Sequence, residues 1–388
     1  MLSDRIDILS ESITIAVTTL AQELRAAGKD VLSFSAGEPD FDTPQVIKDS
    51  AIAAINAGFT KYTAVDGIPE LKNAVIAKLK RDNGLEYAPN QVIVSNGAKH
   101  SLFNLFQATI NEGDEVIIPA PYWVTYPELV KYCSGTVVEI HTDDTSRFKI
   151  TPEQLKSAIT PKTKMLILTT PSNPTGSVYS KAELEALGDV LKGTDILVAS
   201  DEMYEKLVYD GEFTSAAAIS EDMYNRTITI NGLSKSVAMT GWRFGYLAAK
   251  DPELIKAMKK LQSQSTSNIC SITQKAAITG LDGSADEDIE MMRKAFAERR
   301  DEAVDLFNAI DGLSVVKPDG AFYLFVNIQN FEKDSIKFAK ELLEDTGVAV
   351  VPGAGFGSEG YFRFSFATDI ESIREGIRRI EAFIKKRR

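Results

Sequence analysis

The chain has 388 residues, of which 44% are hydrophobic and 25% are charged. This composition is typical of a globular protein with a real core, and the length suits two or three domains of roughly 150 residues each. Acidic side chains outnumber basic ones by 55 to 43, which gives a formal charge of −12 and a pI near 4.9. A general nucleic-acid surface needs a basic face, so we expect no nucleic-acid partner.

Few cysteines and histidines are present. The two cysteines, Cys133 and Cys270, and the two histidines, His100 and His141, are too few for a disulfide framework or a histidine-rich metal site. No apolar run approaches the roughly 20 residues of a membrane-spanning helix. Charged residues among the first eleven positions do not fit a secretory signal. We therefore expect a cytoplasmic protein with no metal and no membrane contact.

Short β-branched runs alternate with helical patterns between about residues 45 and 280. The predicted strands are QVIVSN (91–96), DEVIIPA (114–120), TVVEI (136–140), TKMLILTT (163–170), DILVASD (195–201) and TITIN (227–231). Helical patterns lie between them, as at 67–81, 100–110 and 181–192. This alternation predicts a mostly parallel sheet covered by helices, and such sheets bind ligands beyond the carboxyl ends of their strands.

The pattern changes after about residue 285. A charged helix over about 286–306 precedes the strand-like GLSVVKPDGAFYLFVNI, a helix at 334–344, the strands VAVVPG and YFRFSFA, and a basic last helix. This order predicts a smaller α+β domain at 286–388. We expect 46–285 to form the large domain and 1–45 to form an arm and part of the small domain.

One glycine motif has to be excluded as a dinucleotide site. Gly355 to Gly360 matches G-x-G-x-x-G and follows the strand-like VAVV. A dinucleotide fingerprint must open a helix within a βαβ unit. Here the period-two pattern YFRFSFA follows instead, so we reject that interpretation.

Polar residues follow several of the predicted strands. Asp201, followed by Tyr204, ends one strand, and Asn173 lies in PSNPTG after another. Each has an ordinary explanation, a helix cap for Asp201 and a rigid turn for PSNPTG, and a functional one at a ligand crevice. Gly97-Ala98-Lys99 joins a strand to a helix start, which favours a phosphate. The helix dipole disfavours a lysine in the first helical turn by about 0.3–1 kcal/mol unless a bound anion compensates its charge.

Lys235 and two further residues, Trp123 and Arg363, complete the candidate set. Lysine is seldom buried, but a desolvated lysine amine adds to carbonyls, and Lys235 follows the strand TITIN. Trp123 follows a strand and suits either ordinary packing or stacking on a planar ring. Arg363, alternating with phenylalanines in YFRFSFA, is either an exposed strand arginine or a bidentate carboxylate ligand. A phosphate cradle, a ring stacker, an amide, a carboxylate and a Schiff-base lysine are what pyridoxal 5′-phosphate requires.

Seven motifs occur in the order of a known family. They are GEPDFDTP (37–44), KYTAVDGIPELK (61–72), PYWVTYPE (121–128), PSNPTG (171–176), SDEMYE (200–205), SKSVAMTGWRFGY (234–246) and FRFSFA (362–367). Over nearly its full length the chain resembles the fold-type I aminotransferases of class I/II, most of all the bacterial and archaeal group that uses aspartate. The resemblance implies an α/β fold, with a mostly parallel seven-stranded sheet in the large domain and a smaller α+β domain.

The resemblance also implies roles for individual residues. Lys235 would be the Schiff-base lysine and proton shuttle, Asp201 would pair with the pyridinium nitrogen, and Tyr204 and Asn173 would hydrogen-bond the ring hydroxyl. The other cofactor residues would be Trp123 on the ring and Gly97, Ala98, Lys99, Ser234 and Arg243 around the phosphate, with Tyr62 from a neighbouring subunit. Arg363 and Gly37 would contact the α-carboxylate of the substrate, and Lys99 would bind its distal carboxylate. Trp123 and Asn173 would also contact the substrate.

From these roles we expect a ping-pong transfer of the amino group of L-aspartate to 2-oxoglutarate, in a homodimer with shared active sites. The partners would be small amino acids and 2-oxoacids. An aromatic or prephenate aminotransferase of the same fold is the nearest alternative, and a C–S lyase or a decarboxylase is more distant. A cofactor-binding regulator would need an appended DNA-binding domain, for which the predicted domains leave no room.

Overall fold

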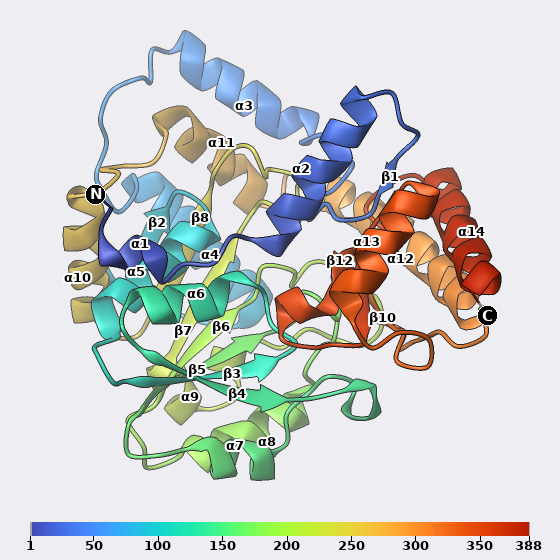
Figure 1. The fold of residues 1–388 in the computed structure, drawn as a ribbon. Coiled ribbons are helices and arrows are strands. Elements are labelled where there is room, and N and C mark those ends of the chain that lie inside the picture. The colour runs from blue at the N-terminus through green and yellow to red at the C-terminus, as the bar shows by residue number, and fades with distance from the viewer. Residues whose placement is uncertain (1, 388) are drawn as a thin grey trace.

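The computed structural model describes residues 2–387, and its largest sheet has seven strands (Figure 1). They are β2 (Val92–Ser95), β3 (Glu115–Ala120), β4 (Thr136–His141), β5 (Thr163–Thr169), β6 (Leu197–Asp201), β7 (Thr227–Gly232) and β8 (Gly245–Ala249). Their order is β2-β8-β7-β6-β5-β3-β4, with β8 antiparallel to both neighbours and the other pairs parallel. The six predicted strands are present and mostly parallel. The residue patterns did not single out β8.

Successive residues of these strands face opposite sides of the sheet. On β2, Ile93 packs into one hydrophobic cluster, whereas Val92 and Val94 pack into another. On β5, Met165 joins the first of these clusters and Leu166 faces the opposite side. Both faces are therefore buried, which explains why the strands are continuous apolar runs.

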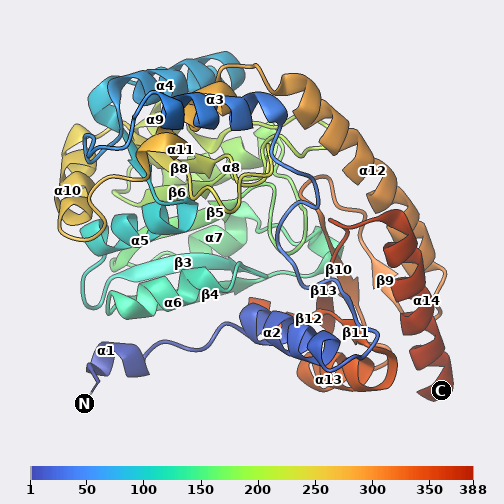
Figure 2. The same ribbon diagram turned by 90° about the horizontal axis from the view of Figure 1, so that it is seen from above.

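Helices cover both faces of this sheet. They are α3 (Gln45–Asn56), α4 (Pro69–Asn83), α5 (Ala98–Thr109), α6 (Thr125–Tyr132), α7 (Pro152–Ala158), α8 (Lys181–Leu191), α9 (Glu221–Arg226), α10 (Pro252–Ser263) and α11 (Ser271–Leu281). The residues of α5, α6 and α10 join the cluster on one face, and those of α3, α4, α7, α8, α9 and α11 cover the other (Figure 2). This is the layered arrangement that the alternating sequence pattern predicts.

A second sheet is built mainly from the C-terminal quarter of the chain. Its order is β12-β13-β10-β9, with β9 at Ser314–Val315, β10 at Tyr323–Asn327, β12 at Val351–Pro352 and β13 at Tyr361–Ser365. The helices α12 (Asp286–Asn308), α13 (Ser335–Thr346) and α14 (Ile370–Arg387) pack around it (Figure 1).

The N-terminal chain joins this smaller part. β1 (Leu32–Ser33) pairs in parallel with β11 (Val348–Ala349), and α1 (Asp4–Asp7) and α2 (Ile13–Ala26) precede it. No sequence pattern had predicted α1, α2 or α3. The pairing supports the assignment of residues 1–45 to an arm and part of the small domain, although the domain boundaries stay a prediction.

Local sequence signals account for several helix boundaries. α8 begins with a capping box in which Ser180 and Glu183 bond each other's backbone, and α4 ends at Gly84 in the left-handed conformation. Gly355 lies in a 3₁₀ turn (Gly353–Phe356) that leads into strand β13, so the rejected dinucleotide motif opens no α-helix. Within residues 2–387, no helix is long and apolar enough to cross a membrane.

Gly245, at the start of β8, allows a close contact that positions the start of α5. A Cβ at Gly245 would lie 2.2 Å from Ala98 N and 2.4 Å from Gly97 C, and both are backbone atoms that cannot give way. Gly241, four residues earlier, has nothing within 4 Å of the same position.

We expect Gly245→Ala to lower the midpoint of thermal unfolding by at least about 2 °C, because overpacking costs about 1–3 kcal/mol. Gly241→Ala is the matched control and should leave the midpoint unchanged. Differential scanning calorimetry of both variants measures the effect. Equal midpoints for the two variants would contradict this role of Gly245.

Candidate active site

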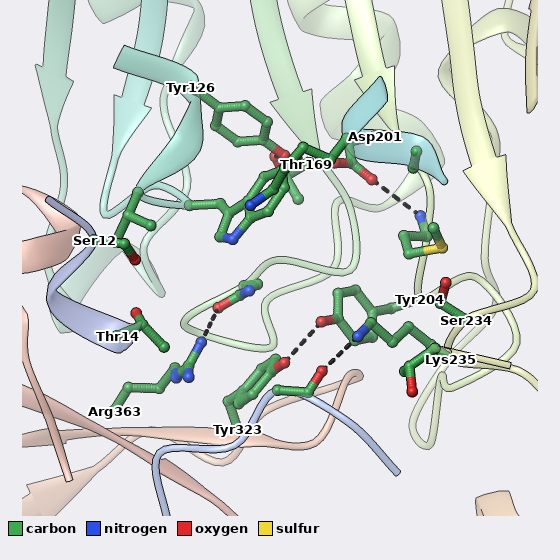
Figure 3. Close-up of a pocket in the computed structure, with 18 of the residues that line it drawn as sticks. Ser12, Thr14, Tyr126, Thr169, Asp201, Tyr204, Ser234, Lys235, Tyr323 and Arg363 are labelled. Atoms are coloured by element: carbon green, nitrogen blue, oxygen red, sulfur yellow. Dashed lines mark hydrogen bonds between the residues drawn. The ribbon is translucent and has the colours of Figure 1, made fainter. Parts of the chain in front are cut away.

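A cavity of about 330 Å³ lies beyond the carboxyl ends of the central strands (Figure 3). Thr169 ends β5 and Asp201 ends β6, and Lys235 follows β7 by three residues. The full lining is Ser12, Thr14, Ile15, Gly37, Ala98, Lys99, Trp123, Val124, Tyr126, Thr169, Asn173, Asp201, Met203, Tyr204, Ser234, Lys235, Thr240, Arg243, Tyr323 and Arg363. The cavity is therefore at the edge of the sheet where a ligand crevice is expected.

Lys235 presents its amine inside this cavity. Its Nζ donates a hydrogen bond to the backbone oxygen of Gly37. Burial brings the pKa of Lys235 down to about 8, and the positive charges of Arg363 and Arg243 act in the same direction. A substantial fraction of the amine is thus neutral near physiological pH, which is the form that adds to a carbonyl.

Asp201 is buried at the end of β6. The Tyr126 hydroxyl donates to its Oδ2 at 2.7 Å, and the Met203 backbone N–H donates to its Oδ1 at 3.3 Å. Residues 203–206 form a turn, so the interpretation of Asp201 as a helix cap is wrong. Burial raises the pKa of Asp201. A carboxylate held in this way favours a cationic group or a bound proton beside it.

Arg363 places a buried guanidinium in the cavity. It is only 2% exposed, so the alternative of an exposed strand arginine is wrong. Its Nη1 donates to Asn173 Oδ1 at 2.9 Å and its Nη2 to the Ser35 backbone oxygen at 2.7 Å, while its Nε has no hydrogen-bond partner. No carboxylate among residues 2–387 pairs with this guanidinium. Burying such a charge is costly, so the site is suited to an anionic ligand.

Two aromatic hydroxyls lie beside that arginine. The Tyr204 and Tyr323 hydroxyls are 2.8 Å apart, and the Arg363 guanidinium lies 4.4 Å from the centre of the Tyr323 ring. Burial raises the pKa of Tyr204, so its hydroxyl keeps its proton. It can therefore donate a hydrogen bond to an oxygen of a ligand.

Two more cations, Lys99 and Arg243, lie near the start of α5. Gly97 has a φ of 88°, and a Cβ there would lie 2.3 Å from Arg243 Nη2. The guanidinium bonds the backbone oxygens of Thr240 and Asn96 at 2.8 and 3.4 Å. Lys99 Nζ lies 4.8 Å from the centre of the Trp123 indole ring. No ion pair with a carboxylate is formed by either cation in the described part of the chain.

The charge of the cavity is opposite to that of the protein. Its lining carries four basic side chains, Lys99, Lys235, Arg243 and Arg363, and one carboxylate, Asp201. The whole chain has a formal charge of −12. Such a cavity favours ligands with negative charges at several separate points.

The profile of the family described as aminotransferase class I and II matches residues 29–380. The chain belongs to this family.

Individual relatives match over almost their whole length. The chain is 49% identical to an aspartate aminotransferase of Bacillus subtilis, covering 99% of both chains, and 52% identical to an aspartate/prephenate aminotransferase of Cereibacter sphaeroides, covering 98% of both. Among solved structures it is similar to the aspartate aminotransferase of Thermus thermophilus with maleate, with a TM-score of 0.95 and 43% identity over 98% of this chain and 99% of that one.

Aminotransferases of this family use pyridoxal 5′-phosphate. The cavity fits this cofactor in three respects. The pKa of the Lys235 amine is lowered, so its neutral form is available to add to the aldehyde of the cofactor. The buried Asp201 carboxylate suits a protonated ring nitrogen. The glycine turn before α5, beside Arg243, suits a phosphate.

The structure brings the predicted site residues together with two exceptions. Gly97 precedes the lining residue Ala98 and is not itself in the lining, and Tyr62 is 92% exposed and outside the cavity. Six polar lining residues were missed: Ser12, Thr14, Tyr126, Thr169, Thr240 and Tyr323. Tyr126 lies inside the motif PYWVTYPE, three residues after Trp123, so a signal for it was present. Nothing in the pattern around Ser12 or Thr14 marked them.

In the protein without cofactor, we expect Lys235 to react with a small aldehyde and cyanoborohydride at a rate that rises with pH and levels off above about pH 8. The amine is protonated below that pH and cannot add to a carbonyl. Mass spectrometry of the labelled peptides gives the rate at each pH, and the exposed Lys181 serves as a control for the reagent. A midpoint of the rate increase at roughly pH 10.4, the pKa of a solvated lysine, would contradict the burial argument.

Proposed function

We propose that the protein transfers the amino group of L-aspartate to 2-oxoglutarate, giving oxaloacetate and L-glutamate in two half-reactions. The observation that carries this proposal is Arg363, a buried guanidinium with no carboxylate partner in residues 2–387, in the same cavity as the amine of Lys235. Every amino acid and every 2-oxoacid carries the carboxylate that this guanidinium lacks. The names of the relatives at 49% and 52% identity support aspartate as one substrate.

The residues around the cavity would hold the cofactor by complementary chemistry. When bound, the cofactor supplies an aldehyde carbon for the amino group and a ring that withdraws electrons from the substrate Cα. Lys235 would hold the aldehyde end, and Asp201 would keep a proton on the ring nitrogen. Tyr204 and Asn173 would bond the ring hydroxyl. Trp123 would cover the ring, and the phosphate region would be held by Gly97, Ala98, Lys99, Ser234 and Arg243.

Lys235 would then move the proton that the reaction requires. Its Nζ, neutral above a pKa of about 8, is the base that takes the proton from the substrate Cα. The hydrogen bond to the Gly37 backbone oxygen holds this amine at the cavity wall, beside another lining residue. Tyr126 holds the Asp201 carboxylate in place at 2.7 Å, which fixes where a ring proton can be held.

Two cations would recognise the two carboxylates of the substrate. Arg363 would hold the α-carboxylate, next to Gly37, and its unpartnered Nε leaves a donor for it. Lys99, over the Trp123 ring, would hold the distal carboxylate of aspartate or glutamate. Maleate, the ligand in the Thermus structure, is also a dicarboxylate. Burial and the charge of Arg243 lower the pKa of Lys99, and a bound carboxylate would restore its proton affinity.

We also propose that the active unit is a homodimer. Tyr62 is 92% exposed and does not line its own cavity, which suits a role in the cavity of a second copy. The apolar residues Val46, Ile52 and Ile55 on the nearby α3 are exposed in the single chain, which supports the proposal that a second copy covers this surface.

A second substrate class has specific support. The relative from Cereibacter sphaeroides at 52% identity is named for prephenate as well as aspartate. Activity with an amino-donor and oxoacid panel decides between the proposals: aspartate with 2-oxoglutarate should give the highest kcat/KM. A higher kcat/KM for aromatic donors or for prephenate would overturn the preference for aspartate.

Lys99→Ala should selectively weaken dicarboxylate substrates. The loss of one charge-assisted hydrogen bond is worth roughly 1.5–3 kcal/mol, or about 10- to 150-fold in kcat/KM. Phenylalanine lacks a distal carboxylate and should be affected little. Steady-state kinetics of Lys99→Ala, with the exposed Lys181→Ala as a control, gives both values. Equal losses for aspartate and phenylalanine would leave Lys99 with its phosphate role alone and overturn its role at the distal carboxylate.

A further inference from the structure

Two fully buried glutamines hold the segment that follows Tyr62. Gln262 on α10 and Gln274 on α11 are each 0% exposed. Helix α10 packs against α5, and helix α11 packs against α4 (Figure 2). The amides of the two glutamines contact residues 63–68, which connect the exposed Tyr62 to the start of α4.

Gln262 uses both ends of its amide. Its Nε2 donates to the backbone oxygens of Val65 at 2.7 Å and Val94 at 2.9 Å. Its Oε1 accepts from Ser95 Oγ at 3.1 Å and Asn104 Nδ2 at 3.0 Å. All four hydrogen-bonding positions of the amide are therefore filled. Because Ser95 ends β2, one side chain links the 63–68 segment to the strand that leads into the Gly97 turn.

Gln274 contacts the same segment from the other side. Its Nε2 donates to Thr63 Oγ1 at 2.8 Å and to the Ile269 backbone oxygen at 3.1 Å. Its Oε1 accepts from the Ile68 backbone N–H at 2.8 Å. Unlike Gln262, it has no hydrogen bond to β2 or to α5.

An ion-pair cluster fixes the middle of the segment as well. Asp66 is buried and pairs with Lys72 at 2.6 Å and Lys259 at 2.8 Å. The segment is therefore tied at Thr63, Val65, Asp66 and Ile68, while Tyr62 itself points into solvent. Buried amides that are hydrogen-bonded to the backbone favour one backbone position over others, because any alternative leaves some of their donors or acceptors unsatisfied.

We propose that Gln262 and Gln274 are positioning residues, which hold residues 63–68 so that Tyr62 is presented to the cofactor phosphate of a second copy of the chain. The inference rests on the proposed function and on the homodimer. Gln274 bonds the Tyr62 segment and Ile269, and it makes no bond to the strand before the phosphate turn. Gln262 bonds that segment, which would serve the partner's site, and also the strand before the phosphate turn of its own site. It would therefore act on both active sites of the dimer.

The test measures the dissociation constant of pyridoxal 5′-phosphate from the full-length protein by absorbance titration. Gln274→Met, which keeps the volume and removes the amide, should weaken binding about tenfold. Thr63→Val removes the acceptor of one Gln274 bond, together with the hydrogen bond from Thr63 Oγ1 to the Ala64 backbone oxygen at 3.3 Å, and should weaken binding less, in the same direction. Gln264→Met changes an exposed glutamine at the end of α10 and should leave the constant unchanged.

A Tyr62→Phe background separates positioning from a general loss of structure. In that background Gln274→Met should have almost no further effect, because the group that it positions is already gone. Gln262→Met should keep part of its effect through Ser95. Unchanged binding in both Gln274→Met and Thr63→Val would overturn the inference, as would a full additional loss for Gln274→Met in Tyr62→Phe.

Folding is controlled separately from binding. If Gln274→Met lowers the unfolding midpoint sharply, Thr63→Val decides the question, because its change is isosteric and near the surface. A wild-type protein that does not bind pyridoxal 5′-phosphate would instead contradict the proposed function. The two failures are therefore distinguishable in one titration series.

Discussion

The burial of two cations, Lys235 and Arg363, in one cavity is the constraint on which the rest of the site depends. Desolvation disfavours both charges, with different outcomes. The lysine responds by a lowered pKa and becomes a nucleophile and base near neutral pH. The arginine stays charged and lacks a carboxylate partner among the described residues, so it requires an anion from outside the chain. One physical cause thus supports both the proposed reactive amine, Lys235, and the proposed substrate anchor, Arg363.

The fold makes this burial possible by bringing together distant parts of the chain. Lys235 and Asp201 come from adjacent parallel strands, β7 and β6, whose carboxyl ends face the same side. Arg363 comes from β13 of the smaller sheet, and its bond to Asn173 joins the two sheets across the cavity. The site therefore lies where the larger and smaller sheets meet, and any relative movement of these parts would change the distance between arginine and lysine.

Residues that follow strands were predictable from the sequence, because parallel strands end at one edge of their sheet. Lys235, Asp201 and Asn173 were found in that way, and the motif order indicated the family. Tyr126 was overlooked although its bond to Asp201 is short, because Trp123 in the same motif received the functional interpretation. Nothing local could have revealed Ser12 and Thr14. They reach the cavity because Ile13 between them packs against Gly355 and the cluster around Phe356, a contact spanning more than 340 positions.

The identity of the lysine that binds the cofactor tests the central claim most directly. The full-length protein is incubated with pyridoxal 5′-phosphate, reduced with borohydride and digested, and the labelled peptide is sequenced by mass spectrometry. The account predicts that the reduced cofactor is attached to Lys235, the lysine whose pKa is lowered to about 8 by burial. Attachment to a different lysine, with Lys235 unmodified, would contradict it.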